Sequence, residues 1–341
     1  MVAPLVTPLS PTPTGGSQAF LVDLARGLEK RGHQVLVYCA APSEVPGLEL
    51  VQVPVEAGLD RALVAMKGPS RQLPAMRVAF QSLYSELRRR GADVVSQHAF
   101  DAEAIELAEG LPVLHTLHLP PIVPALVRAA RSSRARFCAP SESARREWRR
   151  AGLRGLSLVP NGVPEWDPGD PATGSLALIA GRISPEKGVD VGLRAAAAAG
   201  LARLVVGPVY DRAYYESSVK PLLRPGEMLP AMPRQRLWGV MARAAVLLAP
   251  IDWEEPYGLA AAEAQMAGCP VAGYRRGALA EVVEDGISGR LAPPGDFAGL
   301  VAAIAEALAL DRDLVRASAR RRLSLGRSLD AYEAALSGAA A

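Results

Sequence analysis

Two glutamates, Glu255 and Glu263, lie eight residues apart around the start of a predicted helix. Pro256 suits the first turn of that helix and Gly268 suits its end, and good helix formers lie between them. The free N–H groups at a helix start attract anions. The two carboxylates could therefore hold two hydroxyl-bearing parts of one ligand, with the ligand's phosphates at the helix start between them.

The elements that position these residues follow from an alternation of short apolar runs with amphipathic segments. This alternation is typical of α/β folds with parallel sheets. In the first half we expect strands over 35–39, 93–97, 111–117 and 136–140, and helices over 19–30 and 103–108. In the second half we expect strands over 176–180, 203–207, 246–250 and 270–274, helices over 188–199, 235–242 and 259–267, and helical segments over 297–310 and 314–336.

Turn residues without apolar periodicity separate the two halves. We expect each half to be a Rossmann-like domain. The predicted organisation is a first domain over 1–160, a linker over 161–174, a second domain over 175–325 and a C-terminal helix over 326–341 that returns to the first domain.

Composition excludes several classes of protein. Half of the 341 residues are hydrophobic, which excludes global disorder, and no apolar stretch approaches the roughly 20 residues of a membrane span. The three cysteines lie far apart, which argues against disulfides and zinc and for a reducing compartment. Residues 1–10 lack the pattern of a secretory signal. We expect a cytoplasmic protein without nucleic-acid partners.

Basic residues gather in the first half. Residues 1–160 hold 19 Lys and Arg against 14 Asp and Glu, with arginine clusters at 88–90, 128–136 and 145–150. These clusters could contact an anionic acceptor or an anionic membrane surface, which would make the protein peripheral at the membrane. They could equally be the solvated faces of helices.

The segment 255–271 resembles the E-x7-E motif of family 4 glycosyltransferases, which are retaining enzymes of the GT-B fold. Three other segments agree with this family in the same order, and the resemblance is strongest over 160–296. They are 181–188, similar to the diphosphate-binding segment; 160–163, similar to the linker entry; and Gly15-Gly16 with 31–35, similar to the N-terminal glycine loop and strand.

The resemblance implies two Rossmann-like domains that face each other across a cleft, with a C-terminal helix that crosses back to the first domain. The first domain would bind the acceptor and the second the nucleotide sugar. The implied function is retaining, metal-independent transfer of a hexose from a nucleotide diphospho-sugar to a hydroxyl acceptor. A GT-B sugar-nucleotide epimerase and a non-catalytic nucleotide-sugar-binding module are the alternatives.

The resemblance also implies a donor site with no further cofactor. Arg182 and Lys187 would stabilise the departing diphosphate, since a planar fork and a point charge suit its developing negative charge. Glu255 would contact hydroxyls of the donor sugar, and Glu263 those of the ribose. Backbone groups would supply the remaining donor contacts: the N–H groups of Tyr257, Gly258 and Leu259, and the close approach allowed at Gly15, Gly16 and Gly207.

Two histidines and one turn complete the implied site. His98 follows a predicted strand and resembles the histidine that faces the donor sugar. His118 matches the acceptor-side histidine, whereas His115 is expected in the core. Ser141 and Glu142 resemble a turn that faces the cleft on the acceptor side. Glu142 could equally be the acidic residue at a helix start.

Three features depart from the pattern or imitate another one. Asp311-Arg312-Asp313 spells the D-x-D metal motif of the other major glycosyltransferase fold, but we expect it to cap a helix, and we predict no metal site. Ala278 replaces the second glycine of a pair that usually follows the strand ending at Tyr274. The first strand, 1–6, is short, and the loop 7–13 is either an acceptor gate or a mobile terminus.

Overall fold

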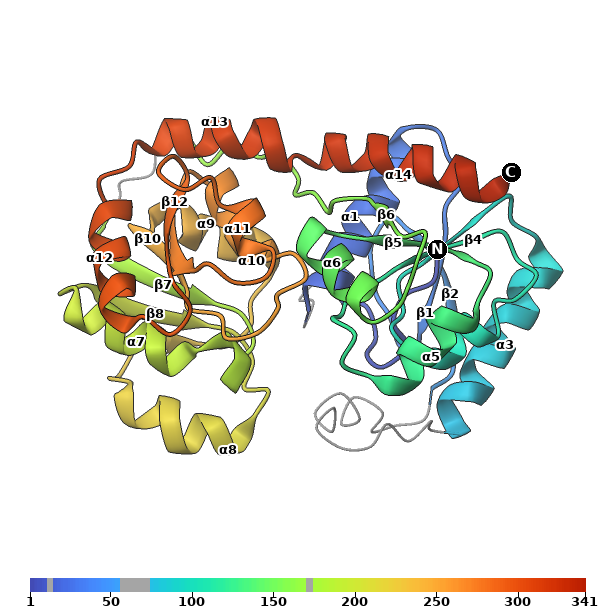
Figure 1. Cartoon of the computed structure of the whole chain (residues 1–341), viewed down its shortest axis with the longest axis horizontal. Helices are drawn as coiled ribbons and strands as arrows, with labels where there is room; N and C mark the ends of the chain where they lie inside the picture. The colour runs from blue at the N-terminus through green and yellow to red at the C-terminus, as the bar shows by residue number, and fades with distance from the viewer. Residues whose placement is uncertain (11–14, 56–73, 170–173) are drawn as a thin grey trace. The chain divides into compact units, whose positions relative to one another are not determined.

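The computed structural model describes residues 1–10, 15–55, 74–169 and 174–341. The chain divides into two compact units. The first comprises Met1–Pro11, Ser17–Asn161 and Gly326–Ala341, and the second comprises Thr12–Gly16 and Gly162–Leu325. Each unit has its own parallel strands (Figure 1), and each has its own hydrophobic core.

In its described residues, the first unit contains six short parallel strands in two sheets, ordered β1-β2 and β3-β4-β5-β6. Val2 bridges both Tyr38 of β1 and Gln97 of β3 and so joins the two sheets. The predicted strand over 1–6 is therefore reduced to one bridging residue, because Pro4 has no N–H to donate and a turn follows it. The strands are β1 (Leu36–Ala40), β2 (Glu49–Val53), β3 (Val95–Gln97), β4 (Val113–Thr116), β5 (Arg136–Ala139) and β6 (Ser157–Leu158).

The helices of the first unit bury one face each. Phe20, Leu21, Leu24 and Leu28 of the first helix are buried at helical spacing, as the sequence predicted. The helices are α1 (Gly16–Lys30), α3 (Pro74–Arg90), α4 (Ala102–Glu106), α5 (Pro124–Ser132), α6 (Glu142–Arg150) and α14 (Leu325–Ala340).

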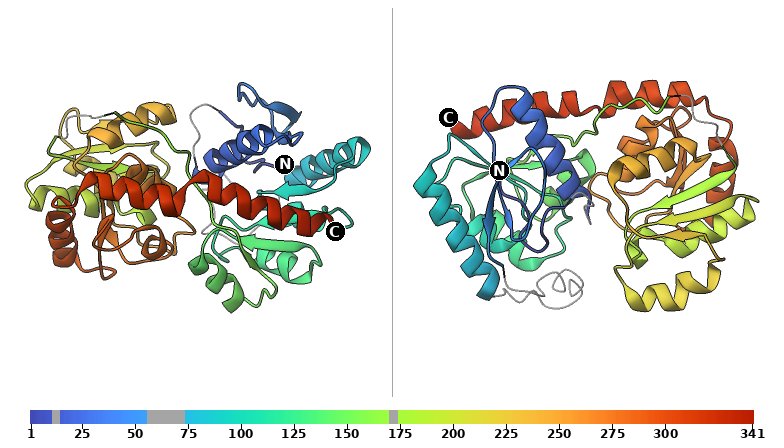
Figure 2. Two further views of the ribbon diagram at one scale, coloured as in Figure 1. Left: turned by 90° about the horizontal axis from the view of Figure 1, so that it is seen from above. Right: turned by 180° about the vertical axis from the view of Figure 1, so that it is seen from behind.

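The C-terminal helix α14 lies beside α1 in both views of Figure 2. Gly27 makes this approach close, since a Cβ there would meet Leu329 at 2.7 Å. Tyr332 is fully buried, with its ring 5.6 Å from that of Phe20. Glu333 pairs with Arg31 and His33 at the end of α1. The last sixteen residues of the chain therefore belong to the first unit, and Leu329, Tyr332 and Leu336 are buried in it.

The second unit is a six-stranded parallel sheet ordered β12-β11-β10-β7-β8-β9. Its strands are β7 (Leu176–Ala180), β8 (Ala202–Val206), β9 (Met228–Leu229), β10 (Val246–Ala249), β11 (Val271–Tyr274) and β12 (Gly289–Ala292). Its longer helices are α7 (Val189–Ala198), α9 (Arg234–Arg243), α10 (Leu259–Met266), α12 (Phe297–Ala307) and α13 (Arg312–Leu323), and α8 (Arg212–Tyr214) and α11 (Leu279–Val282) are short.

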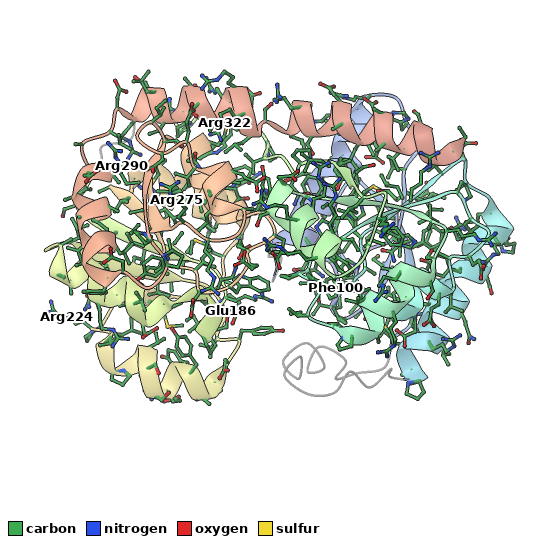
Figure 3. All side chains as sticks on the ribbon, in the orientation of Figure 1. Phe100, Glu186, Arg224, Arg275, Arg290 and Arg322 are labelled. Carbon is green, nitrogen blue, oxygen red and sulfur yellow. The ribbon has the colours of Figure 1, made fainter. Side chains whose placement is uncertain are left out.

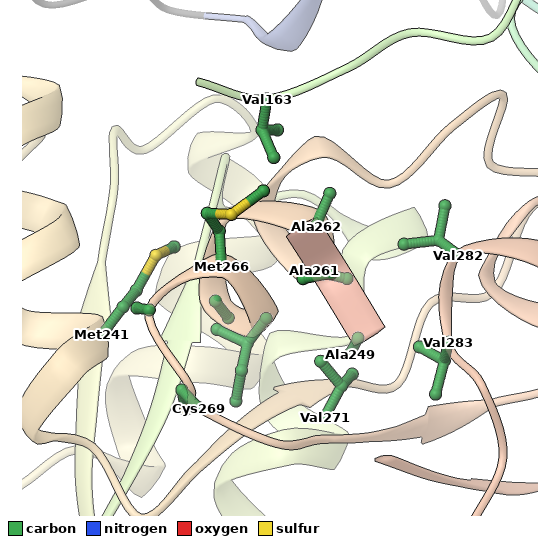
Figure 4. Close-up of a cluster of buried hydrophobic side chains, with 14 of the residues drawn as sticks. Val163, Met241, Ala249, Ala261, Ala262, Met266, Cys269, Val271, Val282 and Val283 are labelled. Atoms are coloured by element: carbon green, nitrogen blue, oxygen red, sulfur yellow. The ribbon is translucent and has the colours of Figure 1, made fainter. Parts of the chain in front are cut away.

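The core of the second unit surrounds α10 (Figure 4). Ala261, Ala262 and Met266 of this helix are buried against Met241, Val271, Val282 and other apolar side chains. Every residue of α10 from Ala261 to Met266 is buried, including the polar Glu263 and Gln265. A helix that is buried on all sides cannot shift without repacking the core, so α10 is a rigid support for its glutamate.

One predicted helical segment consists of two helices, and several elements were missed. The segment predicted as helical over 314–336 is divided at Ser324, which is extended and forms a bridge with Val163. The structure also contains β2, α3, β6, β9 and β12, which the sequence analysis did not include. Strands β6 and β9 have only two residues each, which is too short for periodicity to identify.

Candidate donor-binding site

The loop after β7 carries the two cations of the predicted diphosphate site. Pro185–Lys187 forms a single 3-10 turn, and α7 begins after Gly188. Gly188 has a φ of +63°, and a Cβ there would collide with the carbonyl oxygen of Pro250 at the end of β10. Glycine at 188 thus fixes Lys187 close to the carboxyl end of the sheet, where α/β folds bind ligands.

Lys187 pairs with Glu255 in a half-buried site. Its Nζ lies 2.5 Å from Glu255 Oε2, and the indole Nε1 of Trp253 donates to the same oxygen at 2.6 Å. The ammonium also lies 5.4 Å from the centre of the Trp253 ring. Burial raises the pKa of Glu255, but the Lys187 ammonium, the indole and Arg182 together hold the pKa below its ordinary value. Glu255 is therefore an ionised acceptor.

Arg182 lies beside the same carboxylate. Its guanidinium stacks 4.7 Å from the ring centre of Tyr210 and lies 3.7 Å from Glu186, which is labelled in Figure 3. Ser184 donates to Glu186 at 2.6 Å and orients it. The structure therefore brings together Arg182, Lys187 and Glu255, which are up to 73 residues apart in the sequence.

The second glutamate has its own cation. Glu263 is only about 5% exposed and accepts a hydrogen bond from Arg234 Nε at 2.5 Å. Gly258 precedes α10 with a φ of +90°, a conformation that favours glycine. Tyr257 is buried and Leu259 is the first residue of the helix. The segment predicted to contact sugar and phosphate oxygens thus forms the turn that leads into α10.

At Gly277 and Gly207, backbone segments of the site approach each other closely. A Cβ at Gly277, whose φ is +56°, would lie 2.7 Å from the carbonyl oxygen of Glu255. Ala278 donates its N–H to that oxygen at 2.8 Å. Its own φ of −73° is ordinary for alanine, so the backbone here does not require a second glycine. Gly207 follows β8, and its α-carbon packs against the carbonyl of Gly181.

Gly15 and Gly16 are grouped with the second unit, although α1 begins at Gly16 and continues in the first. Both glycines lie in the described part of the chain, whereas residues 11–13 of the predicted loop 7–13 lie outside it. Their predicted contact with the donor phosphate stays a prediction.

The two predicted histidines lie together inside the first unit. His98 Nδ1 is 2.8 Å from His118 Nε2, and Ser96 Oγ is 2.8 Å from His98 Nε2. Burial lowers the pKa of His98 well below its ordinary value and lowers that of His118 to about 4. Both rings are therefore neutral at pH 7 and hydrogen-bond to each other. His115 lies in β4 against Phe137, which confirms that it is a core residue.

Two segments that the sequence analysis related to helix starts do begin helices. Ser141 precedes α6 and accepts a hydrogen bond from the N–H of Ala144 at 3.0 Å, and Glu142 lies in the first turn, 2.6 Å from Arg145. The interpretation of Glu142 as the acidic residue of a helix start is confirmed. Asp311 caps α13 by accepting from Asp313 N and Leu314 N, which confirms that the D-x-D segment is a capping segment.

Sequence reasoning missed Tyr210, Arg234 and Trp253. Each lies outside the segments that carry the motifs, and each contacts a predicted site residue only through the fold. Of the three, Trp253 would have been the easiest to predict, because it lies only two residues before Glu255.

Comparison with known proteins decides the class of the chain. The sequence model described as Glycosyltransferase Family 4 matches residues 14–165, and the one described as Glycosyl transferases group 1 matches residues 166–323. The chain is a glycosyltransferase. The two matches follow each other without a gap and support an assignment to family 4, and the nature of the protein as an enzyme is confirmed.

Two curated relatives match this glycosyltransferase over most of its length. A D-inositol 3-phosphate glycosyltransferase of Acidothermus cellulolyticus is 28% identical, over 89% of this chain and 80% of the relative. A phosphatidyl-myo-inositol mannosyltransferase of Mycobacterium leprae is 28% identical, over 90% of this chain and 87% of the relative.

Solved structures share the fold. Anabaena HepE, solved in complex with UDP and glucose, superposes with a TM-score of 0.75 over 98% of each chain at 17% identity. The predicted GT-B fold of two Rossmann-like halves is therefore confirmed. In the part of the glycosyltransferase that the structure describes, no helix is both long and apolar enough to cross a membrane.

Proposed function

We propose that this glycosyltransferase is a retaining, metal-independent enzyme that moves a hexose from a nucleotide diphospho-sugar to a hydroxyl acceptor. The observation that carries the proposal is the arrangement of two cations and two carboxylates in the second unit. Lys187 is paired with Glu255, Arg182 lies beside them, and Glu263 lies about one turn into α10.

These residues match the charge changes of the reaction. When the bond between the sugar's anomeric carbon and the diphosphate breaks, the electron pair moves to the diphosphate. Arg182 and Lys187 are fixed positive charges that stabilise this leaving group where water is largely excluded. Glu255 is ionised and accepts hydrogen bonds from hydroxyls of the sugar. Glu263 accepts from the ribose.

Retention implies that the acceptor hydroxyl bonds to the anomeric carbon on the face that the diphosphate leaves. We assign contacts with the donor sugar to His98 and contacts with the acceptor to His118, Ser141 and Glu142. Since both histidines are neutral, neither adds charge near the sugar. Both ring nitrogens of His98 are already hydrogen-bonded, to Ser96 and to His118, so His98 would contact the donor only in exchange for one of these hydrogen bonds.

The proposal is tested by a transfer assay in the presence of EDTA. UDP-glucose and GDP-mannose serve as donors, with inositol 3-phosphate and phosphatidylinositol vesicles as acceptors, and mass spectrometry detects the glycosylated product. We expect product with EDTA present, with an anomeric configuration by NMR that matches the donor. An inverted product would reject retention, and activity lost with EDTA would reject metal independence. An epimerised donor without transfer would favour an epimerase.

An anionic or lipid-linked acceptor is proposed from two observations. Both relatives carry names that specify an inositol phosphate or a phosphatidylinositol acceptor. Residues 124–154 contain nine arginines and two glutamates, and helices α5 and α6 expose Arg128, Arg131, Arg146, Arg149 and Arg150. We call these five residues the α5–α6 basic face. The cluster at 88–90 differs, because Arg89 and Arg90 pair with Glu86 and Arg88 donates to backbone carbonyls.

Vesicle flotation tests this face. We expect the protein to float with vesicles that contain phosphatidylinositol or phosphatidylglycerol but not with pure phosphatidylcholine, and the double variant Arg146→Gln/Arg149→Gln to lose most of this binding. A matched double variant on α3, Arg89→Gln/Arg90→Gln, should retain it. Equal flotation of the two double variants would contradict the assignment to the α5–α6 basic face.

A further inference from the structure

The two glutamates around α10 are held in the same way. Each pairs with one cation at 2.5 Å, and each cation lies over one tryptophan. Lys187 contacts both Glu255 and Trp253, and Arg234 contacts both Glu263 and Trp238, with its guanidinium 5.0 Å from the ring centre. Motif reasoning accounts for Lys187, but nothing so far assigns a role to Arg234.

Arg234 comes from a different element than its partner. It is the first residue of α9, whereas Glu263 lies in the middle of α10, 29 residues later. The two side chains are about 15% and 5% exposed. Trp238, one turn after Arg234, stacks on Trp166 with 5.6 Å between ring centres and 17° between ring planes. The guanidinium of Arg234 thus contacts Trp238, which in turn stacks on Trp166, and these contacts restrain the guanidinium.

Stability alone is a poor reason for this pair. The desolvation of two buried charges usually offsets their attraction, and apolar replacements of buried pairs are often neutral or stabilising. Apart from Gln265, the surrounding helix consists of leucine, alanine and methionine, so an apolar residue at 263 would fit the core of Figure 4. A charged pair at this place is better explained by a ligand that needs an ionised, oriented carboxylate.

We propose that Arg234 is a positioning residue that orients Glu263 for the ribose hydroxyls of the donor and thereby sets the preference for a ribonucleotide. This inference rests on the proposed function, in which Glu263 binds the ribose. Arg234 holds Oε1 from one side and keeps the carboxylate in one rotamer. A carboxylate held in one rotamer can accept hydrogen bonds from the two neighbouring hydroxyls of a ribose. A nucleotide that lacks these hydroxyls leaves the carboxylate buried without those hydrogen bonds, which costs binding free energy.

The test compares UDP with 2′,3′-dideoxy-UDP, and GDP with its dideoxy counterpart, by calorimetric titration of the whole protein. We expect the wild type to bind the ribose form of its preferred nucleotide roughly 10- to 100-fold more tightly than the dideoxy form, as for charge-assisted hydrogen bonds. Arg234→Met should reduce this ratio to below about 5-fold. Arg234→Lys should restore part of it, because the ammonium keeps the charge without the fork.

The matched control is Arg203→Met. Arg203 pairs with Glu227 at 2.7 Å and is about 9% exposed, so the substitution removes a comparable buried pair at the other side of the same sheet. Its ribose preference should equal that of the wild type. Thermal unfolding of each variant verifies folding, and if Arg234→Met does not fold, Arg234→Lys and Trp238→Phe carry the test, since each should lower the ratio.

The outcomes separate the two claims. If Glu263→Gln collapses the ribose preference and the folded Arg234 variants keep it, Arg234 is only a structural partner and this inference is overturned. If Glu263→Gln also keeps the preference, Glu263 does not bind the ribose, and both claims about this helix fail. If neither UDP nor GDP binds the wild type, the same comparison is made with ADP, and if the wild type binds none of the three and also fails to bind TDP, the proposed donor site itself is wrong.

Discussion

The substitution Lys187→Met removes the ammonium that pairs with Glu255 and keeps the aliphatic stem. Lys187 is about 21% exposed and Glu255 about 12%, so the carboxylate that remains is largely buried. Breaking a buried pair costs about 3–5 kcal/mol, and we expect ~2–4 kcal/mol here because water reaches part of the site. For a unit of this size, that corresponds to a melting temperature lower by roughly 5–15 °C.

The pH dependence of this loss has a defined sign. Glu255 has a lowered pKa in the folded protein, so its contribution to stability is complete above the ordinary glutamate pKa and is lost as the pH falls through the folded value. The difference in melting temperature between wild type and Lys187→Met should therefore be largest near neutral pH and should shrink below about pH 4.5. Thermal unfolding followed by circular dichroism between pH 3.5 and 8 measures it.

Activity and stability should separate in the double variant Lys187→Met/Glu255→Gln. The unpaired carboxylate is gone, so stability should recover toward the wild type, whereas turnover should remain at least ~10²-fold lower because the leaving diphosphate lacks its cation. The exposed Lys220, which pairs with Glu216 on its own helical segment, provides the control Lys220→Met. A folded Lys187→Met that matches this control in stability and turnover would refute the reasoning.

Three other predictions concern the two units separately. Burial lowers the pKa of His98 and of His118 in the folded state, so the free energy of unfolding should fall as the pH drops from about 6.5 toward 4. The fall should reach up to ~1.4 kcal/mol per pH unit for each histidine. In urea unfolding of His118→Gln, the free energy of unfolding should change less steeply with pH than in the wild type. An equal slope would mean that His118 is not the titrating group. Asp311→Ala removes the cap of α13 and should cost ~0.5–2 kcal/mol in urea unfolding while the activity measured with EDTA stays at the wild-type level; a loss of turnover would give this aspartate a functional role. Gly188→Ala should lower the melting temperature and abolish nucleotide binding, since its Cβ collides with the carbonyl of Pro250, and a variant that binds normally would show that this turn tolerates another conformation.

The sequence predicted helices and strands accurately where a periodic pattern of apolar residues occurred together with turn-forming residues at the ends. The strand over 176–180 and the helices that became α7, α9 and α10 were placed within one residue at each end, because long apolar runs and glycine or proline at the ends define them. The sequence analysis placed the start of a C-terminal helix at 326 but not the cause of the break before it, because the extended Ser324 pairs with Val163, a residue 161 positions away. Periodicity contains no information about such a partner.

The candidate site shows the same limit. Motif residues such as Arg182, Lys187 and Glu255 could be named because their types and spacing suit a diphospho-sugar. Their supports, Tyr210, Trp253 and Arg234, could not, because stacking over a cation and pairing with a buried carboxylate depend on how separate elements pack. Likewise the sequence indicates two useful histidines, but only the fold shows that His98 and His118 hydrogen-bond to each other.

The most direct test of the central claim is a thermal-shift comparison of UDP, GDP, ADP and TDP on the wild type and on Arg182→Met/Lys187→Met, all with EDTA. A nucleotide at 100 times its dissociation constant should stabilise the wild type by about 2.7 kcal/mol. We predict a higher melting temperature with one of these diphosphates, no shift for the double variant, and an unchanged shift for Lys220→Met. The absence of any shift in the folded wild type, or an equal shift in the double variant, would contradict a diphosphate site at Arg182 and Lys187.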